Sequence, residues 1–394
     1  MDQTKKQIAL LAVCQGLLLT NNSVLVTING LTGLALAPDK GLATLPVTTY
    51  LIGSALTTLP VSLLMKQWGR RAGFTLGAVC AILGSMLCAL GVYTKNFWMV
   101  CGGTFVLGIY FAAGQYYRFA ATEVSPASFR SKAISLVLAG GILGGFLGPF
   151  SSRMAKDAVP GHTYAGGYLS LILFALLAII VLRWIQVPRL SEGERRNTGR
   201  PLRAIVMQPA FFVAVWCAVV SYGVMNLLMT ATPLAMVACE HPFADAAFVI
   251  QWHVLGMYAP SFFTGSLIQR FGVTRIILTG VLLNFISVAT ALSGIDVMHF
   301  WLASTLVGIG WNFMYIGATT LLTETHTPAE RAKAQGVNDM AIFTTMVATS
   351  FLSGALFTYQ GWNMMNTLAI PFLILAGGAI TGLAWMKRKA AAVA

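Results

Sequence analysis

The stretch TEVSPASFRSKA at residues 122–133 recurs as TETHTPAERAKA at residues 323–334. The two stretches share Thr, Glu, Arg, Lys and Ala at matching positions, with a constant offset of 201 residues. A second pair, SLLMKQWGRRAG at 62–73 and GSLIQRFGVTRI at 265–276, falls in a short basic loop of each half. Because the offset is about half of the 394-residue chain, the sequence predicts two homologous halves.

The composition places both halves in a membrane. Hydrophobic residues make up 57% of the chain, charged residues only 9%, and the mean hydropathy is +0.76. Soluble globular proteins lie far from these values. Apolar runs long enough to cross a lipid bilayer recur along the whole chain, and their number predicts an all-α membrane protein with twelve transmembrane helices in two six-helix bundles.

The polar stretch VPRLSEGERRNTGRPLR at residues 187–203 divides the chain. We expect an N-terminal bundle at 1–186, a cytoplasmic linker at 187–203 and a C-terminal bundle at 204–394. If the N-terminus is cytoplasmic, every Lys and Arg except Lys40, Lys95, Arg153 and Lys156 lies on the cytoplasmic side. This bias predicts a multi-pass protein of a bacterial inner membrane with both termini cytoplasmic. The net charge of +13 then reflects topology and contact with anionic lipid, and not nucleic-acid binding.

The loops LLMKQWGRRAG and SLIQRFG resemble the signature of the major facilitator superfamily, in which a glycine, an acidic residue and a Gly-Arg-Arg cluster occupy this position. Ser62 stands where glycine is usual, and Lys66 and Gln269 stand where aspartate is usual. The resemblance covers all twelve predicted spans and implies the fold of that superfamily, with transport by alternating access. The implied gating residues are Lys66, Gly69, Arg70, Arg71, Arg130, Arg270, Gly272 and Arg331.

The carboxylates argue against two classes of transporter. All twelve, Asp339 among them, fall in predicted loops or at span ends. Proton-coupled drug exporters and sugar symporters commonly carry the proton on an acid within a span, so both classes are disfavoured. Arg118 is a candidate for holding an anion, but its place near the cytoplasmic end of its span favours a charge extended toward water.

Methionine and histidine side chains form a second pattern. Met225 and Met229 stand one helical turn apart, with Met236 further along the same stripe, and His253 and Met257 repeat this spacing in the next span. Thioether and imidazole groups suit copper, especially Cu(I). Two other interpretations remain, because the 17 methionines are also ordinary core fillers and a lone histidine can bond a neighbouring helix.

Met-x-x-x-Met in the seventh span with His-x-x-x-Met in the eighth is similar to the hallmark of the CcoA-like transporters, a superfamily branch that imports copper for cytochrome oxidase assembly. The resemblance implies copper-ligand roles for Met225, Met229, His253 and Met257. Met236, Cys14 and Cys217 are additional candidates from their positions alone. We therefore expect copper import, with copper as substrate, no cofactor, and copper chaperones or oxidase assembly factors as further partners.

A small organic solute such as riboflavin is the alternative cargo, because the branch is also said to include riboflavin-transporter-like members. Polar and aromatic side chains suited to a flat ring are Asn21, Asn22, Gln115, Tyr116, Trp311, Asn312 and Tyr315. Aromatic residues near span ends also form interfacial belts, which is the competing interpretation. No phosphate-binding loop, nucleophile elbow or paired carboxylate occurs, so the sequence gives no support for an ATP-driven pump or an enzyme.

Overall fold

The structure is a computed structural model that describes residues 2–39, 42–155, 157–188, 191–193 and 199–393. Lys40, Lys156 and, within the predicted linker, residues 189–190 and 194–198 lie outside the described residues. The described part of the first half contains α1 (Asp2–Leu36), α2 (Leu45–Trp68), α3 (Arg70–Tyr93), α4 (Phe97–Gly114), α5 (Tyr117–Glu123), η2 (Ala127–Phe129), α6 (Arg130–Ala139), α7 (Ile142–Ala155) and α8 (Ala165–Leu182). The second half contains α10 (Leu202–Val206), α11 (Pro209–Ala238), α12 (Phe243–Tyr258), α13 (Ser261–Phe271), α14 (Val273–Ser293), α15 (Val297–Leu322) and α16 (Arg331–Val393).

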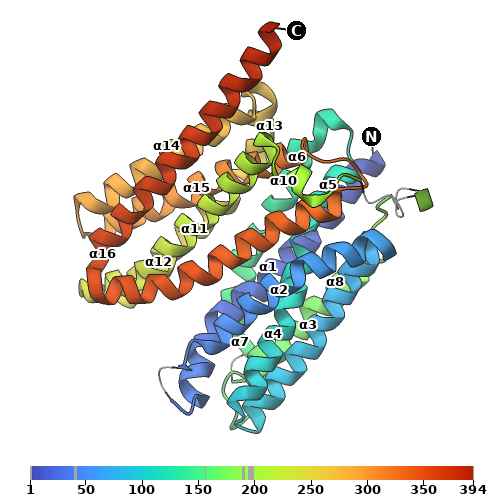
Figure 1. Cartoon of the computed structure of the whole chain (residues 1–394). Coiled ribbons are helices and arrows are strands. Elements are labelled where there is room, and N and C mark those ends of the chain that lie inside the picture. The colour runs from blue at the N-terminus through green and yellow to red at the C-terminus, as the bar shows by residue number, and fades with distance from the viewer. Residues whose placement is uncertain (1, 40–41, 156, 189–190, 194–198, 394) are drawn as a thin grey trace. The chain divides into compact units, whose positions relative to one another are not determined.

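These helices confirm the all-α membrane fold. No strand occurs among the described residues, and ten of their helical segments are long and apolar enough to cross a membrane. The predicted eighth span is divided into α12 and α13 at Pro260, whose ring removes a backbone N–H. The last two predicted spans correspond to the two helices within α16, which meet at a kink at Gly361, where φ is 73° (Figure 1).

The chain forms two compact units. Unit 1 comprises Met1–Ala127, Leu136–Thr198 and Arg331–Phe343, and unit 2 comprises Ser128–Ser135, Gly199–Glu330 and Thr344–Ala394. In unit 1, α4 lies against α2 and α3, while α1 lies against α7 and α8. In unit 2, α15 lies against α11, α12 and α14. Each unit therefore incorporates a short segment from the other half of the sequence.

The repeated basic loops adopt the same backbone turn. Gly69 separates α2 from α3 with φ 89°, and Gly272 separates α13 from α14 with φ 85°. Each glycine N–H closes the preceding helix by donating to the carbonyl of Met65 or Ile268. Glycine is favoured here because a side chain rarely tolerates such a positive φ.

A close crossing of α12 and α15 positions His253. A Cβ added at Gly308 would lie 2.6 Å from the His253 carbonyl oxygen, and one at Gly256 would lie 2.7 Å from the Thr305 carbonyl oxygen. The two glycines therefore let the helix backbones approach more closely than any larger residue would permit. This approach brings the imidazole of His253 against Ser304 of α15.

Candidate functional site

A buried ion pair lies in unit 1. Arg118 Nη2 of α5 donates to Asp339 Oδ1 of α16 at 2.5 Å, and the two side chains are 1% and 2% exposed. Arg118 Nη1 also donates to the Gln115 carbonyl at 2.6 Å and to Gln115 Oε1 at 3.1 Å. The expectation that Arg118 extends into water is wrong, because a carboxylate within the protein satisfies its charge. Asp339 lies inside α16 and not in a loop.

Two predicted gating residues meet at one carboxylate in unit 1. Arg70 Nη2 lies 2.7 Å from Glu123 Oε1, and Arg331 Nη1 lies 3.0 Å from Glu123 Oε2. Arg70 also donates to Gln335 Oε1 at 2.5 Å. Glu123 thus provides an acidic group for these two arginines, whereas Lys66 stands where the superfamily motif usually has an aspartate. Glu123 was not predicted as a gating residue. Its signal in the sequence is its place in the repeated stretch at residues 122–133.

The other predicted gating side chains differ in exposure. Arg71, Arg130 and Arg270 are exposed, and the Arg270 guanidinium lies 5.2 Å from the centre of the Phe271 ring. Lys66 is half-buried.

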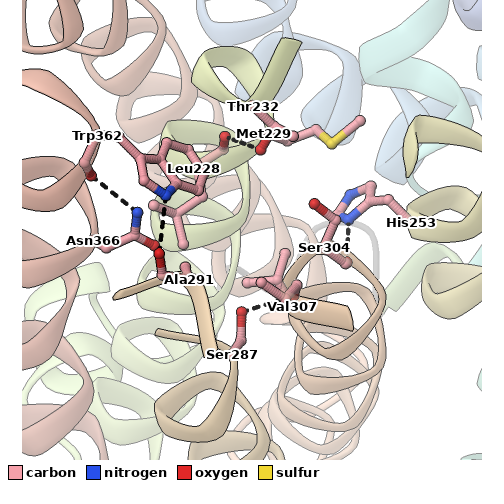
Figure 2. A pocket seen from close by; sticks show the side chains of 11 residues that line it. Leu228, Met229, Thr232, His253, Ser287, Ala291, Ser304, Val307, Trp362 and Asn366 are labelled. Carbon is pink, nitrogen blue, oxygen red and sulfur yellow. Dashed lines mark hydrogen bonds between the residues drawn. The ribbon is translucent and has the colours of Figure 1, made fainter. Parts of the chain in front are cut away.

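Of the four expected copper ligands, two line one pocket. Figure 2 shows His253 of α12 and Met229 of α11 among the residues around this pocket in unit 2. His253 Nδ1 lies 2.8 Å from the Ser304 carbonyl oxygen. Since a carbonyl only accepts, Nδ1 carries the hydrogen and Nε2 keeps a lone pair. Met225 and Met257 are buried but are not among the lining residues.

The additional candidates for metal binding lie among apolar neighbours or deep in the core. Met236 packs in a cluster with Ala235, Ala246, Val249 and Phe300. Cys14 and Cys217 are fully buried free thiols. Among the described residues, no group of three or more His, Cys, Asp or Glu side chains is placed to hold a metal ion.

Four aromatic rings in unit 2 form what we name the aromatic cluster: Tyr222, Tyr258, Trp311 and Tyr315. Trp311 stacks on Tyr315 with ring centres 5.0 Å apart. Tyr222 meets Trp311 edge-on at 5.2 Å, and Tyr258 does so at 5.8 Å. Trp311 Nε1 is buried without a hydrogen-bond partner among the described residues. Trp311 and Tyr315 were predicted from sequence, whereas Tyr222 and Tyr258 were missed because their convergence depends on three separate helices.

The predicted amide Asn312 bonds to the neighbouring helices α12 and α13. Its Nδ2 donates to the Met257 carbonyl at 2.6 Å and to Ser261 Oγ at 2.5 Å, while its Oδ1 accepts from Thr264 at 2.7 Å. The hydrogen bonds of the Asn312 amide therefore join α15 to α12 and α13.

Three further predicted residues lie in unit 1. Asn22 Oδ1 accepts from the Tyr50 hydroxyl at 2.9 Å, and the Tyr116 hydroxyl donates to the Thr58 carbonyl at 2.8 Å. Asn21 Nδ2 bonds within its own helix, and Asn21 Oδ1 is buried without a hydrogen-bond partner among the described residues.

Comparisons with known proteins define the class. A sequence model of the Major Facilitator Superfamily matches residues 11–252 and 217–393, so the chain belongs to this superfamily of transporters. It is 41% identical over 373 residues, 94% of each chain, to the riboflavin transporter RfnT of Brucella anthropi. It also resembles the uncharacterized MFS-type transporter YdeG of Bacillus subtilis at 26% identity, over 90% of this chain and 87% of that one.

Solved structures share the fold. The human organic anion transporter MFSD10 superposes with a TM-score of 0.78 at 11% identity, covering 96% of this chain and 99% of that one. The outward conformation of the transporter FucP gives 0.74 at 14% identity, covering 95% and 98%. At these identities the likeness concerns the fold alone.

The expectation of copper import, with copper as the partner, is wrong. The relative that matches almost the whole chain is named for an organic solute and not for a metal. The helical spacing of Met225 and Met229 has a simpler physical cause, since Met225 is buried in unit 2 as methionines commonly are in protein cores.

Proposed function

We propose that this chain carries riboflavin, or a solute with a similar flat fused-ring system, across the membrane. The observation that carries the proposal is the 41% identity to the riboflavin transporter RfnT over 94% of both chains. Transport is expected by alternating access, without a bound cofactor.

The aromatic cluster supports recognition of such a ring. Large planar rings stack on Trp and Tyr in offset or edge-on arrangements, both of which occur among Tyr222, Trp311 and Tyr315. The unpartnered Nε1–H of Trp311 offers a donor to a ring carbonyl. Trp311 and Tyr315 stack on each other in the structure. A planar solute that stacks on Trp311 would take the place of the Tyr315 ring.

The membrane placement is part of the same proposal. The basic residues favour a bacterial inner membrane with both termini in the cytoplasm. In this proposal residues 1–186 and 204–394 form the two homologous bundles, and residues 187–203 form the cytoplasmic linker.

The test is uptake of labelled riboflavin by bacterial cells that neither make nor import it. Cells with the chain should accumulate label above the vector control. Lumichrome, which contains only the ring system, should compete, whereas ribitol, which resembles only the side chain, should not. Accumulation equal to the vector control, with membrane insertion verified by immunoblot, would contradict the proposal. Competition by ribitol alone would refute ring recognition by the aromatic cluster.

A further inference from the structure

A small pocket inside unit 2 is lined by apolar side chains and by a few polar groups, some of which present hydrogen-bond acceptors. It lies among α11, α12, α14, α15 and α16 and has room for about one water molecule. Figure 2 shows His253 on one side and Trp362 and Asn366 of α16 on the other.

Two acceptor atoms here are buried and unsatisfied. His253 is 1% exposed, its Nδ1–H is used on the Ser304 carbonyl, and its Nε2 has no hydrogen-bond partner among the described residues. Asn366 is fully buried, its Nδ2 donates to the Trp362 carbonyl at 3.0 Å, and its Oδ1 likewise has no partner. A buried polar atom without a partner is rare in native proteins.

Three further lining side chains donate to backbone carbonyls. Thr232 Oγ1 donates to the Leu228 carbonyl at 2.8 Å, and Ser287 Oγ donates to the Ala303 carbonyl at 2.7 Å. Trp362 Nε1 donates to the Ala291 carbonyl at 3.1 Å. Lone pairs on His253 Nε2 and Asn366 Oδ1 therefore remain for an occupant to donate to.

A proline adds one more acceptor beside the pocket. Pro233 in α11 has no N–H, so the carbonyl of Met229, four residues earlier, lacks its usual donor within the helix. In membrane helices, ordered waters commonly satisfy carbonyls freed in this way.

We propose that this pocket binds ordered water, the neutral hydrogen-bond donor that its acceptors require. No charged side chain lines the pocket, so a cation entering it would lose hydration without a compensating charge. A water molecule is neutral and pays no such charge-desolvation cost, and single waters fill polar sites of this size in many proteins. The water donates to His253 Nε2 of α12 and to Asn366 Oδ1 of α16, the two lining acceptors that lack partners among the described residues.

The experiment is water-edited solid-state NMR on the full-length protein in lipid bilayers, with ¹⁵N-labelled histidine. The signals of His253 are assigned by their loss in His253→Gln. We expect rapid magnetisation transfer from water to His253 Nε2 although the side chain is 1% exposed. Absence of this transfer in the wild type would overturn the proposal.

Matched variants test the water site itself. Asn366→Leu removes one acceptor and should lower the transfer by about twofold or more. Asn363→Leu changes the same residue type at an exposed position one turn earlier and should leave it unchanged. Val307→Leu adds a methylene to the lining without removing an acceptor and should also lower the transfer. If Asn366→Leu or Val307→Leu folds and leaves the transfer from water to His253 unchanged, the water site is refuted.

Discussion

Arg118 and Asp339 form a buried charge pair, with Arg118 Nη2 2.5 Å from Asp339 Oδ1. Arg118 comes from the first half of the sequence and Asp339 from the second, yet both belong to unit 1. Asn338 Nδ2 donates to the same Asp339 oxygen at 2.8 Å. The beginning of α16 is therefore held in unit 1 by charged and polar contacts and not by apolar packing alone.

Breaking this pair should destabilise the protein. Asp339→Ala leaves Arg118 buried without its carboxylate, which typically costs about 3–5 kcal/mol. We expect a clear fall in the unfolding midpoint of the purified protein. Asp296→Ala is the control, because the Asp296 side chain is 84% exposed and its partner His299 lies 3.6 Å away.

The double variant Arg118→Gln/Asp339→Asn removes both charges and keeps the approximate shapes. Its loss of stability should be smaller than the sum of the two single losses, because neither partner is left as a lone buried charge. Strictly additive losses would show that the two groups act independently.

Trp311→Ala should weaken riboflavin uptake by removing a stacking surface. Loss of one aromatic stacking contact costs about 1–3 kcal/mol, so we expect the KM for uptake to rise by about tenfold. Trp311→Phe keeps a ring and should lose less. Trp385→Ala removes a tryptophan that is 63% exposed and should leave the KM unchanged. An unaltered KM in Trp311→Ala would remove the aromatic cluster from the substrate route.

Gly308→Ala should push α12 away from α15. The added Cβ would lie 2.6 Å from the His253 carbonyl oxygen, and backbone cannot yield as a side-chain tip does. We expect a loss of about 1–3 kcal/mol, measured by thermal unfolding. Gly378→Ala in α16 meets nothing within 4 Å and should stabilise slightly through higher helix propensity. Equal behaviour of the two variants would contradict the close helix crossing.

Glu330 should raise the free energy of unfolding at neutral pH, and this contribution should disappear when the carboxylate is protonated. Hydrogen bonds from the Arg200 guanidinium, at 2.7 and 2.8 Å, hold the pKa of Glu330 well below its usual range. A lowered pKa adds stability that is complete above the ordinary value of about 4.3 and declines as the pH falls toward the folded value. The stability advantage of wild type over Glu330→Gln should follow this course in unfolding scans between pH 7 and pH 3.

The matched control for Glu330 is Glu324→Gln. Glu324 pairs with Lys387 at 3.2 Å, but both side chains are about half exposed, so this pair should contribute little. A stability advantage over Glu330→Gln that is already lost at pH 6 would contradict the lowered pKa.

Much of the fold could be predicted from local sequence. Hydropathy identifies spans because each helix must satisfy its own backbone in lipid, and the repeat at 122–133 and 323–334 predicts two homologous halves. The separation of the last two predicted spans agrees with the structure, because two helices meet at Gly361, whose φ of 73° interrupts the helical backbone.

The candidate site was predicted less well. Helical spacing correctly places Met225 and Met229 on one face of α11, but it does not say whether that face meets a ligand, lipid or a neighbouring helix. In the structure Met229 lines a pocket with His253, while Met225 does not. Trp311 and Tyr315 were identified as ring-binding candidates, and the structure adds Tyr222 and Tyr258 beside them.

Hydropathy and helical periodicity were enough to predict an all-α membrane protein, because both are properties of residues close together in the chain. The loop motif at 62–73 predicted a transporter of the major facilitator superfamily. Only the tertiary structure decided that Arg118 meets Asp339, that Glu123 joins Arg70 to Arg331, and that His253 bonds Ser304. Such partners are far apart in the chain, and packing selects one pairing among many that the same helices permit.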